Sequence, residues 1–191
     1  MLVDSHCHLN FPEFTENINA VRESMLDAGV SHALCVSVTL DKFPEVLALA
    51  EQYDNFYASV GVHPDYEDIE EPTIETLVSL AQHSKIIAIG ETGLDYFRLK
   101  GDLEWQRMRF RTHISAAINV GKPLIIHTRS AAEDTIRIMQ EQGADQVGGV
   151  MHCFTESLDV ALAAIDMGFY ISFSGIVTFK NAQQIKAVSY T

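Results

Sequence analysis

The strongest constraint on the fold is a regular alternation of short apolar runs with longer amphipathic stretches along the 191 residues. The apolar runs lie at 2–3, 32–38, 56–62, 86–90, 124–127, 149–152 and 169–173. Such nearly continuous runs are typical of parallel strands that are covered on both faces of a sheet. Helical periodicity fills the intervals near 16–28, 42–53, 73–83, 102–120, 131–142 and 157–167. This strict strand-then-helix order predicts an α/β fold.

Seven apolar runs in this order predict a TIM-type (β/α) barrel that is incomplete, with about seven of its eight strands present. A complete barrel of this type usually needs about 250 residues. We therefore expect a single barrel domain over 1–191 that lacks its last unit. The segment 181–191 predicts the start of a further helix.

The long helical pattern near 102–120 has one apolar stripe, which we expect to face the core rather than a cofactor. Its members are Trp105, Met108, Ile114, Ala117 and Ile118. Three histidines, His32, His83 and His113, lie in or beside helical patterns, and we assign them no chemistry.

Residues of metal-ligand type gather where the predicted strands end. They are His6 and His8 after the first run, His63 after the third, Glu91 after the fourth, His127 after the fifth and His152 after the sixth. The carboxyl ends of all strands in a (β/α) barrel share one face, and that face holds the active site. We therefore expect these residues to converge although they are remote in sequence.

His6 and His8 form an H-x-H pair on a strand, so both imidazoles point to the same side and can bind one divalent ion. A pair of ordinary surface or core histidines is the alternative. The ligand-type residues at three further strand ends favour the metal. His127 and His152 each follow an apolar strand, and we predict that they are metal ligands too.

Glu91 directly follows the apolar run 86–89, where an unpaired carboxylate is costly to bury. A cation offsets that cost, and a carboxylate can bridge two ions; a structural salt bridge is the alternative. Asp95 follows in the next loop and is predicted to orient a water molecule or a ligand histidine, unless it is a turn residue. We predict catalytic roles for both carboxylates.

Two further residues are predicted to contact the substrate. Arg129 lies beside His127 and suits a phosphate contact, with a structural ion pair as the alternative. His63, in G-V-H-P at 61–64, suits binding of a ligand or the phosphate, with a capping role as the alternative.

The formal net charge of -13 argues against non-specific wrapping of duplex DNA, which needs Lys and Arg to neutralise phosphates. It does not exclude a nucleic-acid enzyme, because bound divalent cations reverse the local field. The three cysteines form no C-x-x-C pair, and the N-terminus has no secretory signal pattern. No apolar run approaches the roughly 18 residues of a membrane span. We expect a soluble, cytoplasmic protein with reduced thiols and no membrane partner.

Taken together, the motifs resemble the TatD family of metal-dependent deoxyribonucleases, within the amidohydrolase-like barrel group. The matching segments are D-S-H-C-H at 4–8, G-V-H-P at 61–64, G-E-T-G-L-D-Y at 90–96, the region 106–110, P-L-I-I-H-T-R at 123–129, H-C-F-T at 152–155 and F-S-G-I-V-T-F-K-N-A at 173–182. They occur in order over essentially the whole chain, and the ordered set is far more specific than any single motif.

The resemblance implies two divalent ions, Mg²⁺, Mn²⁺ or Zn²⁺. His6 and His8 would hold one ion, Glu91 would bridge, and His127 and His152 would hold the other. It also implies hydrolysis of single-stranded DNA from the 3′ end. The family uses an aspartate in a later E-T-D type motif, and no such residue precedes Thr191. We therefore expect a truncated family member whose activity is impaired.

Two other functions remain open from the sequence. The same barrel and metals serve hydrolysis of a cyclic amide, a lactone or a small phosphoester, and fold alone does not choose among these. The second alternative is that the chain is a non-catalytic remnant. In that case the unpaired edges of the first and seventh strands are expected to promote self-association.

Overall fold

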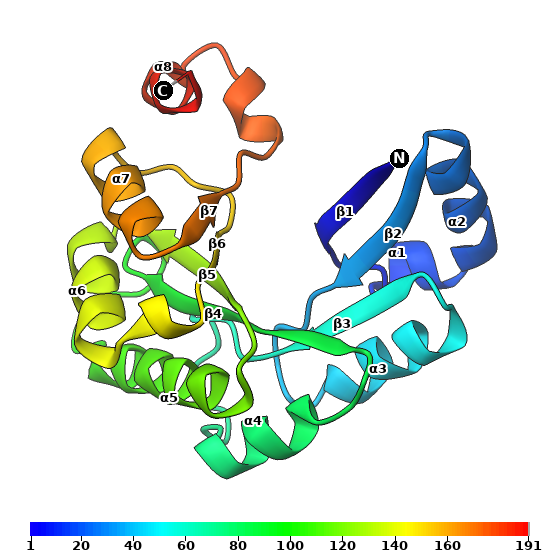
Figure 1. Cartoon of the computed structure of the whole chain (residues 1–191), viewed down its shortest axis with the longest axis horizontal. Coiled ribbons are helices and arrows are strands. Elements are labelled where there is room, and N and C mark those ends of the chain that lie inside the picture. The colour runs from blue at the N-terminus through cyan, green and yellow to red at the C-terminus, as the bar shows by residue number, and fades with distance from the viewer. Residues whose placement is uncertain (191) are drawn as a thin grey trace.

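The computed structural model describes residues 1–190, and Thr191, the last residue of the predicted domain, lies outside the described part. Seven parallel strands form one sheet in sequence order (Figure 1). The strands are β1 (Leu2–Cys7), β2 (Val30–Cys35), β3 (Phe56–Val60), β4 (Ile86–Asp95), β5 (Leu124–Arg129), β6 (Gly149–Met151) and β7 (Phe169–Ile171). Every predicted strand is present, and the predicted fold class is confirmed.

Helices connect successive strands and cover the outer, convex side of the sheet, and one last helix follows β7 (Figure 1). They are α1 (Pro12–Thr15), α2 (Ile18–Asp27), α3 (Phe43–Gln52), α4 (Ile74–Ala81), α5 (Glu104–Val120), α6 (Ala132–Gln142), α7 (Leu158–Asp166) and α8 (Gln183–Ser189), with 3-10 turns at Ala144–Gln146 and Gly175–Thr178. Within residues 1–190, none of these helices combines the length and the apolar character that crossing a bilayer requires.

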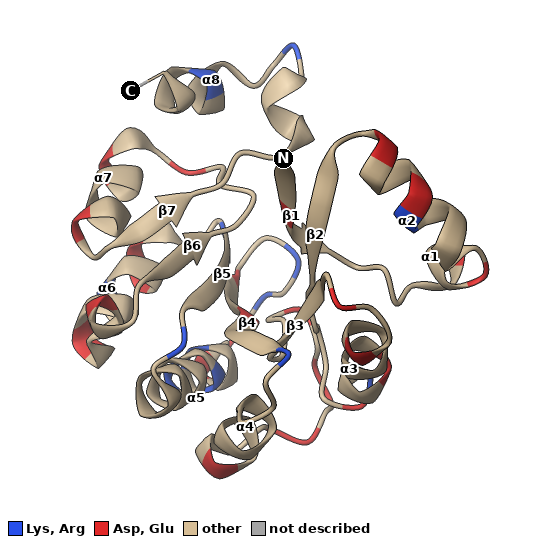
Figure 2. Cartoon of the chain, turned by 45° about the vertical axis from the view of Figure 1, so that its right-hand side comes forward, with Lys and Arg blue, Asp and Glu red and all other residues tan. Residues whose placement is uncertain are grey.

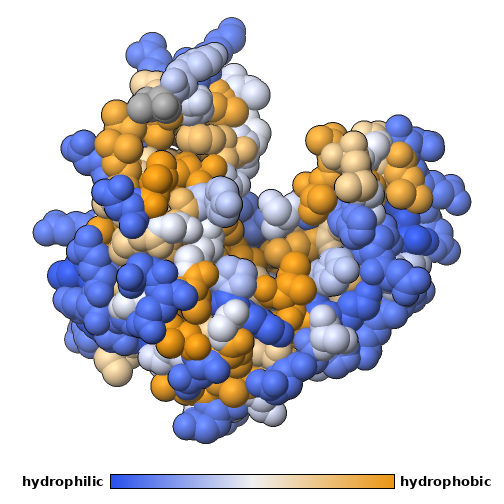
Figure 3. Space-filling view, in the orientation of Figure 1, coloured by the Kyte–Doolittle hydropathy of each residue, from blue (hydrophilic) through white to orange (hydrophobic). Residues whose placement is uncertain are grey.

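The sheet is curled like a barrel but is open on one side. Within the described residues, β1 pairs only with β2, and β7 pairs only with β6. β1 and β7 therefore lie on opposite sides of the opening, and the space-filling view shows a hollow between them (Figures 1 and 3). The carboxyl ends of the strands still share one face, as the sequence predicted.

The main hydrophobic core lies between the sheet and its helices. Phe56, Phe110, Ile114, Leu124 and Ile138 are among its fully buried side chains. Burial of each such side chain stabilises the fold by roughly 1.5–3 kcal/mol. A second, smaller cluster joins Leu34 and Val36, on or directly after β2, with Ala88 of β4 and Ile125 of β5. The core thus fixes the strands whose ends carry the candidate ligands.

The predicted apolar stripe of α5 is partly wrong. Met108 is 54% exposed, whereas Gln106, Arg109 and His113 are buried on the same helix. Periodicity of apolar residues alone missed this face because its three polar side chains are satisfied by hydrogen bonds that only the folded chain provides.

Strand β4 is longer than predicted and ends at Asp95, so this residue lies on the strand instead of in the loop after it. Gly93 allows β4 to run close to β5. Its φ of 136° is unfavourable for other residues, and a side chain there would collide with the carbonyl oxygen of His127. The close approach sets Asp95 beside His127.

Candidate metal centre

Strands β1 and β4 bring together the first group of ligand-type residues. Potential ligand atoms of His6, His8 and Glu91 all lie within 4.8 Å of one another. His6 Nε2 is 3.3 Å from Glu91 Oε2. The predicted convergence of the H-x-H pair with Glu91 is thus present in the structure.

A second group shares the same carboxylate. It consists of His63, Glu91 and His127, again with ligand atoms within 4.8 Å of one another. Glu91 Oε1 lies 3.8 Å from His63 Nε2 and 3.5 Å from His127 Nδ1. Glu91 is only 4% exposed and belongs to both groups, which is the position that a bridging carboxylate requires.

Hydrogen bonds outside the two groups orient two of the histidines. His8 Nδ1 lies 3.1 Å from the carbonyl oxygen of Val36, which can only accept, so Nε2 keeps its lone pair. His127 Nε2 donates to Asp95 Oδ2 at 3.1 Å, and Nδ1 faces Glu91, to which the protonated ring donates; loss of that proton frees the Nδ1 lone pair for a cation. Metal-binding histidines are oriented in this way by carbonyl and carboxylate partners.

The residues present fit a divalent cation. His6 Nδ1 is buried and has no hydrogen-bond partner among residues 1–190. Imidazole nitrogens together with a carboxylate oxygen are the ligands that Zn²⁺ and related ions prefer. A cation would also give this unpaired nitrogen a partner.

The electrostatics of the cluster are those of a carboxylate held between histidines. Burial on its own would raise the pKa of Glu91, but hydrogen bonds from His127 and His6 hold it well below its ordinary value. Burial likewise opposes protonation of His127, yet its hydrogen bonds with Glu91 and Asp95 raise its pKa. The carboxylate is therefore ionised and available to a cation at neutral pH.

His152 was predicted as a ligand of the second ion, and it lies at the edge of the cluster. Its ring is stacked on that of His6, with the centroids 3.4 Å apart. It belongs to neither of the two groups described above. Burial and the neighbouring His6 lower its pKa to about 4, so the ring is neutral and can donate a lone pair to a cation. Its role as a ligand remains a prediction.

His63 was predicted to contact the substrate and not to be a metal ligand. In the structure it lies inside the second group of ligand-type residues. The backbone amide of Asp65 donates to His63 Nδ1 at 3.2 Å. In the neutral ring Nε2 therefore carries the hydrogen and faces Glu91 as a donor. Burial lowers the pKa of His63 to about 4, which keeps the ring neutral.

Asp95 and Arg129 end neighbouring strands and are partners in the β4–β5 register. Asp95 contacts His127 through one carboxylate oxygen, and its other oxygen accepts from the amides of Phe97 and Arg98. It is thus both a turn residue and a partner of a candidate ligand. The guanidinium of Arg129 lies 3.9 Å from the centroid of the Phe97 ring.

A cavity of about 530 Å³ opens over the cluster. It is lined by His8, Phe11, Val38, His63, Asp65, Tyr66, Glu91, Asp95, Arg98, His127 and Arg129. Sequence reasoning missed Phe11, Tyr66 and Arg98. Their only signal was closeness to the H-x-H, G-V-H-P and G-E-T-G-L-D-Y motifs. Figure 2 shows acidic residues spread over the outer helices and basic segments in the central loops.

The fold and the cluster together define an α/β barrel-type protein with a candidate metal centre at the carboxyl ends of its strands. The family model described as "TatD related DNase" matches residues 3–190. The chain therefore belongs to the TatD family, and it is a metal-dependent hydrolase of that family.

Individual relatives agree with this assignment. The chain is 41% identical to the "uncharacterized metal-dependent hydrolase YabD" of Bacillus subtilis over 189 residues, which cover 98% of this chain and 74% of that protein. It is 39% identical to YcfH of Escherichia coli, described in the same words, with coverage of 97% and 71%. The crystal structure of YjjV, a TatD homolog from Escherichia coli, matches with a TM-score of 0.89 and 30% identity, covering 98% of this chain and 73% of that one.

Proposed function

We propose that this chain is a phosphodiesterase that uses two divalent ions, Mg²⁺, Mn²⁺ or Zn²⁺, and acts on single-stranded DNA from the 3′ end in the cytoplasm. The single observation that carries the proposal is Glu91, a buried carboxylate shared by two groups of histidines. The description "TatD related DNase" of the matching family model supports DNA as the substrate. The three free cysteines support a reducing compartment.

Each residue of the cluster has a defined task in this proposal. His6 and His8 hold one ion, His127 and His152 hold the other, and Glu91 lies between them. Bound divalent ions lower the pKa of a water molecule and offset the charge that develops on a phosphate. Asp95 keeps the Nε2 hydrogen of His127 engaged, so that Nδ1 faces the metal side.

Substrate contacts come from the walls of the cavity. The Nε2 hydrogen of His63 points into the cluster and suits a non-bridging phosphate oxygen. Arg129 is held over Phe97 by a cation–π contact and lines the same cavity, so its charge is available to a second oxygen. Phe11 and Tyr66, each 39% exposed, offer ring faces on which unpaired bases can stack.

The test is the metal content of the purified chain after equilibration with Mn²⁺ and removal of the excess, measured with and without His152→Ala. We expect about two ions per chain and a lower content in the variant. His83→Ala is the matched control, because His83 lies at the end of α4 and pairs with Glu51 far from the cluster. An unchanged content in His152→Ala would remove that residue from the ligand set.

Hydrolysis is then compared on a single-stranded oligonucleotide, a small phosphodiester, and a panel of lactones and cyclic amides. Cleavage of the oligonucleotide from its 3′ end supports the proposal. Cleavage confined to the lactones or amides would contradict the phosphodiester assignment. Metal content without any hydrolysis would indicate a remnant that retains only its metal site.

A further inference from the structure

Helix α5 presents a buried polar face to the loops that carry the candidate site. Gln106, Arg109 and His113 follow one another at spacings of three and four residues, which puts them on one side of a helix. Each makes hydrogen bonds with backbone groups at the ends of β3 or β4. Gln106 contacts the backbone of Asp95, whose side chain touches the candidate ligand His127.

Gln106 makes hydrogen bonds with both backbone polar groups of Asp95. The amide N–H of Asp95 donates to Gln106 Oε1 at 3.0 Å, and Gln106 Nε2 donates to the carbonyl oxygen of Asp95 at 3.2 Å. The chemistry of the two backbone groups fixes which way the side-chain amide points. Both residues are fully buried, so neither water nor another side chain replaces these contacts.

The Asp95 side chain links its fixed backbone to the candidate metal centre. One carboxylate oxygen accepts from the amides of Phe97 and Arg98 at 2.9 and 3.0 Å, which fixes the carboxylate plane. The other lies 3.1 Å from His127 Nε2. A rotation of the Asp95 backbone would therefore turn the carboxylate away from the histidine and release its ring.

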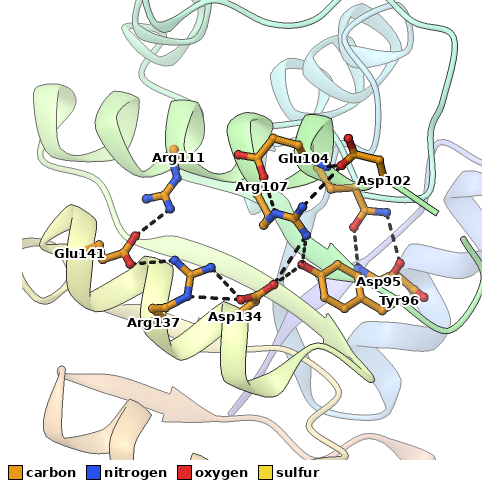
Figure 4. Close-up of polar contacts among 10 residues, drawn as sticks. Asp95, Tyr96, Asp102, Glu104, Arg107, Arg111, Asp134, Arg137 and Glu141 are labelled. Atoms are coloured by element: carbon orange, nitrogen blue, oxygen red, sulfur yellow. Dashed lines mark hydrogen bonds and ion pairs between the residues drawn. The ribbon is translucent and has the colours of Figure 1, made fainter. Parts of the chain in front are cut away.

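Gln106 is the side chain that holds both backbone groups of Asp95 itself. The pairing of β4 with β5 holds the next peptide, where the amide of Tyr96 donates to the carbonyl oxygen of Arg129 at 2.9 Å. The next residue, Tyr96, is held by Asp134 and Arg107 in a network of ion pairs between α5 and α6 (Figure 4). Those contacts are partly exposed and constrain the loop from outside, where each ion pair contributes little. The contacts of Gln106 are fully buried and act directly on the Asp95 backbone.

We propose that Gln106 is a positioning residue that sets the orientation of His127 through Asp95. The inference rests on the proposed metal site and deepens it. Outer residues that orient a metal-binding histidine typically change metal affinity or activity by about 10- to 100-fold when they are replaced. Gln106 contacts His127 only through Asp95, so its effect should be smaller. We expect the loss of its hydrogen bonds to lower metal affinity by about 5- to 10-fold.

The test uses Gln106→Met, which keeps the length of the side chain and removes both contacts. In the metal-free chain, the Phe97 and Arg98 amides should exchange with solvent at least about tenfold faster. Mn²⁺ affinity should fall by about 5- to 10-fold. In an Asp95→Asn background the same substitution should change Mn²⁺ affinity by less than about twofold, because the partner through which it acts is already lost.

Two outcomes would overturn the proposal: unchanged exchange of the two amides, or an equal loss of Mn²⁺ affinity in both backgrounds. Tyr53→Phe is the control, since it removes a hydrogen bond with Asn19 that is remote from the cluster; it should alter neither quantity. If Gln106→Met does not fold, Gln106→Asn replaces it, because its side chain is one methylene shorter and carries the amide away from both backbone groups of Asp95. A parent chain that binds no Mn²⁺ would refute the proposed function, whereas amide exchange would still decide the role of Gln106.

Discussion

The imidazole rings of His6 and His152 lie nearly parallel, with their centroids 3.4 Å apart and 8° between their planes. Burial disfavours a positive charge on the His152 ring, and at this separation a charge on the His6 ring adds repulsion. These effects lower the pKa of His152 to about 4. His152 is thus held in its neutral form, which is the form of histidine that binds a metal.

The first prediction is that acid destabilises the metal-free chain between about pH 6.5 and 4. Burial lowers the pKa of His63, His113 and His152 to about 4. In this window they bind protons only after unfolding, so the free energy of unfolding falls as the pH falls. The lowered pKa of Glu91 also makes the free energy of unfolding fall with pH, in the more acidic part of the window. The raised pKa of His127 has the opposite effect, but His127 is a single group against several.

The measurement is the melting temperature in the presence of a chelator at several pH values across this window. The melting temperature should decrease steadily toward pH 4. A melting temperature that is constant or rises on acidification would contradict the prediction.

The second prediction concerns the loop that carries His63. Arg109 is 3% exposed, pairs with Glu71 and donates to the carbonyl oxygens of His63 and Tyr66. Arg109→Met removes donors from two carbonyl groups and should lower the free energy of unfolding by about 2–3 kcal/mol. Urea denaturation measures this change.

Arg111→Met provides the matched comparison on the same helix. Arg111 pairs with Glu141 at the surface, so its loss should change the free energy of unfolding by no more than about 1 kcal/mol. Equal losses in the two variants would show that Arg109 acts as an ordinary surface ion pair and does not fix the His63 loop.

The third prediction tests the phosphate contact proposed for Arg129. A guanidinium that binds phosphate equally in the ground state and the transition state affects KM more than kcat. Arg129→Met should raise KM for a single-stranded oligonucleotide by about tenfold and leave kcat within about twofold. Arg137→Met is the control, because Arg137 pairs with Asp134 and Glu141 on α6. A change in kcat alone would argue against the assignment.

The strands and the convergence of ligands were predictable because parallel strands align their carboxyl ends. That rule alone brought His6, Glu91 and His127 together from three strands. The stacking of His152 on His6 was not predictable, since it depends on how far the sheet curls between β1 and β6.

The support of the site from α5 was hidden for a different reason. A buried glutamine such as Gln106 looks like a solvent-facing residue until its backbone partners are known. His113 likewise had no apparent role, yet it accepts a hydrogen bond from the amide of Val62 and donates to the carbonyl oxygen of Arg109. Hydrogen bonds between distant segments leave no periodic pattern in the sequence.

The last prediction concerns the open edges of the sheet. Leu2 and Val3 on β1 are each 60% exposed, and Tyr170 on β7 is 81% exposed. Unpaired edges with apolar side chains promote pairing with other chains, and a lysine on an edge strand opposes it. We propose that the chain self-associates through these edges, and we expect its mass from light scattering to rise with concentration.

Val3→Lys combined with Tyr170→Lys should shift this association to higher concentration. Tyr190→Lys is the matched control, since Tyr190 is 90% exposed but follows α8, away from both edges. A monomeric mass at all concentrations for the unsubstituted chain would refute self-association. An equal shift in the control would mean that the strand edges do not govern the association. Each added lysine makes the net charge of -13 less negative, which by itself reduces repulsion between chains, so a weaker association in the edge variant cannot come from net charge.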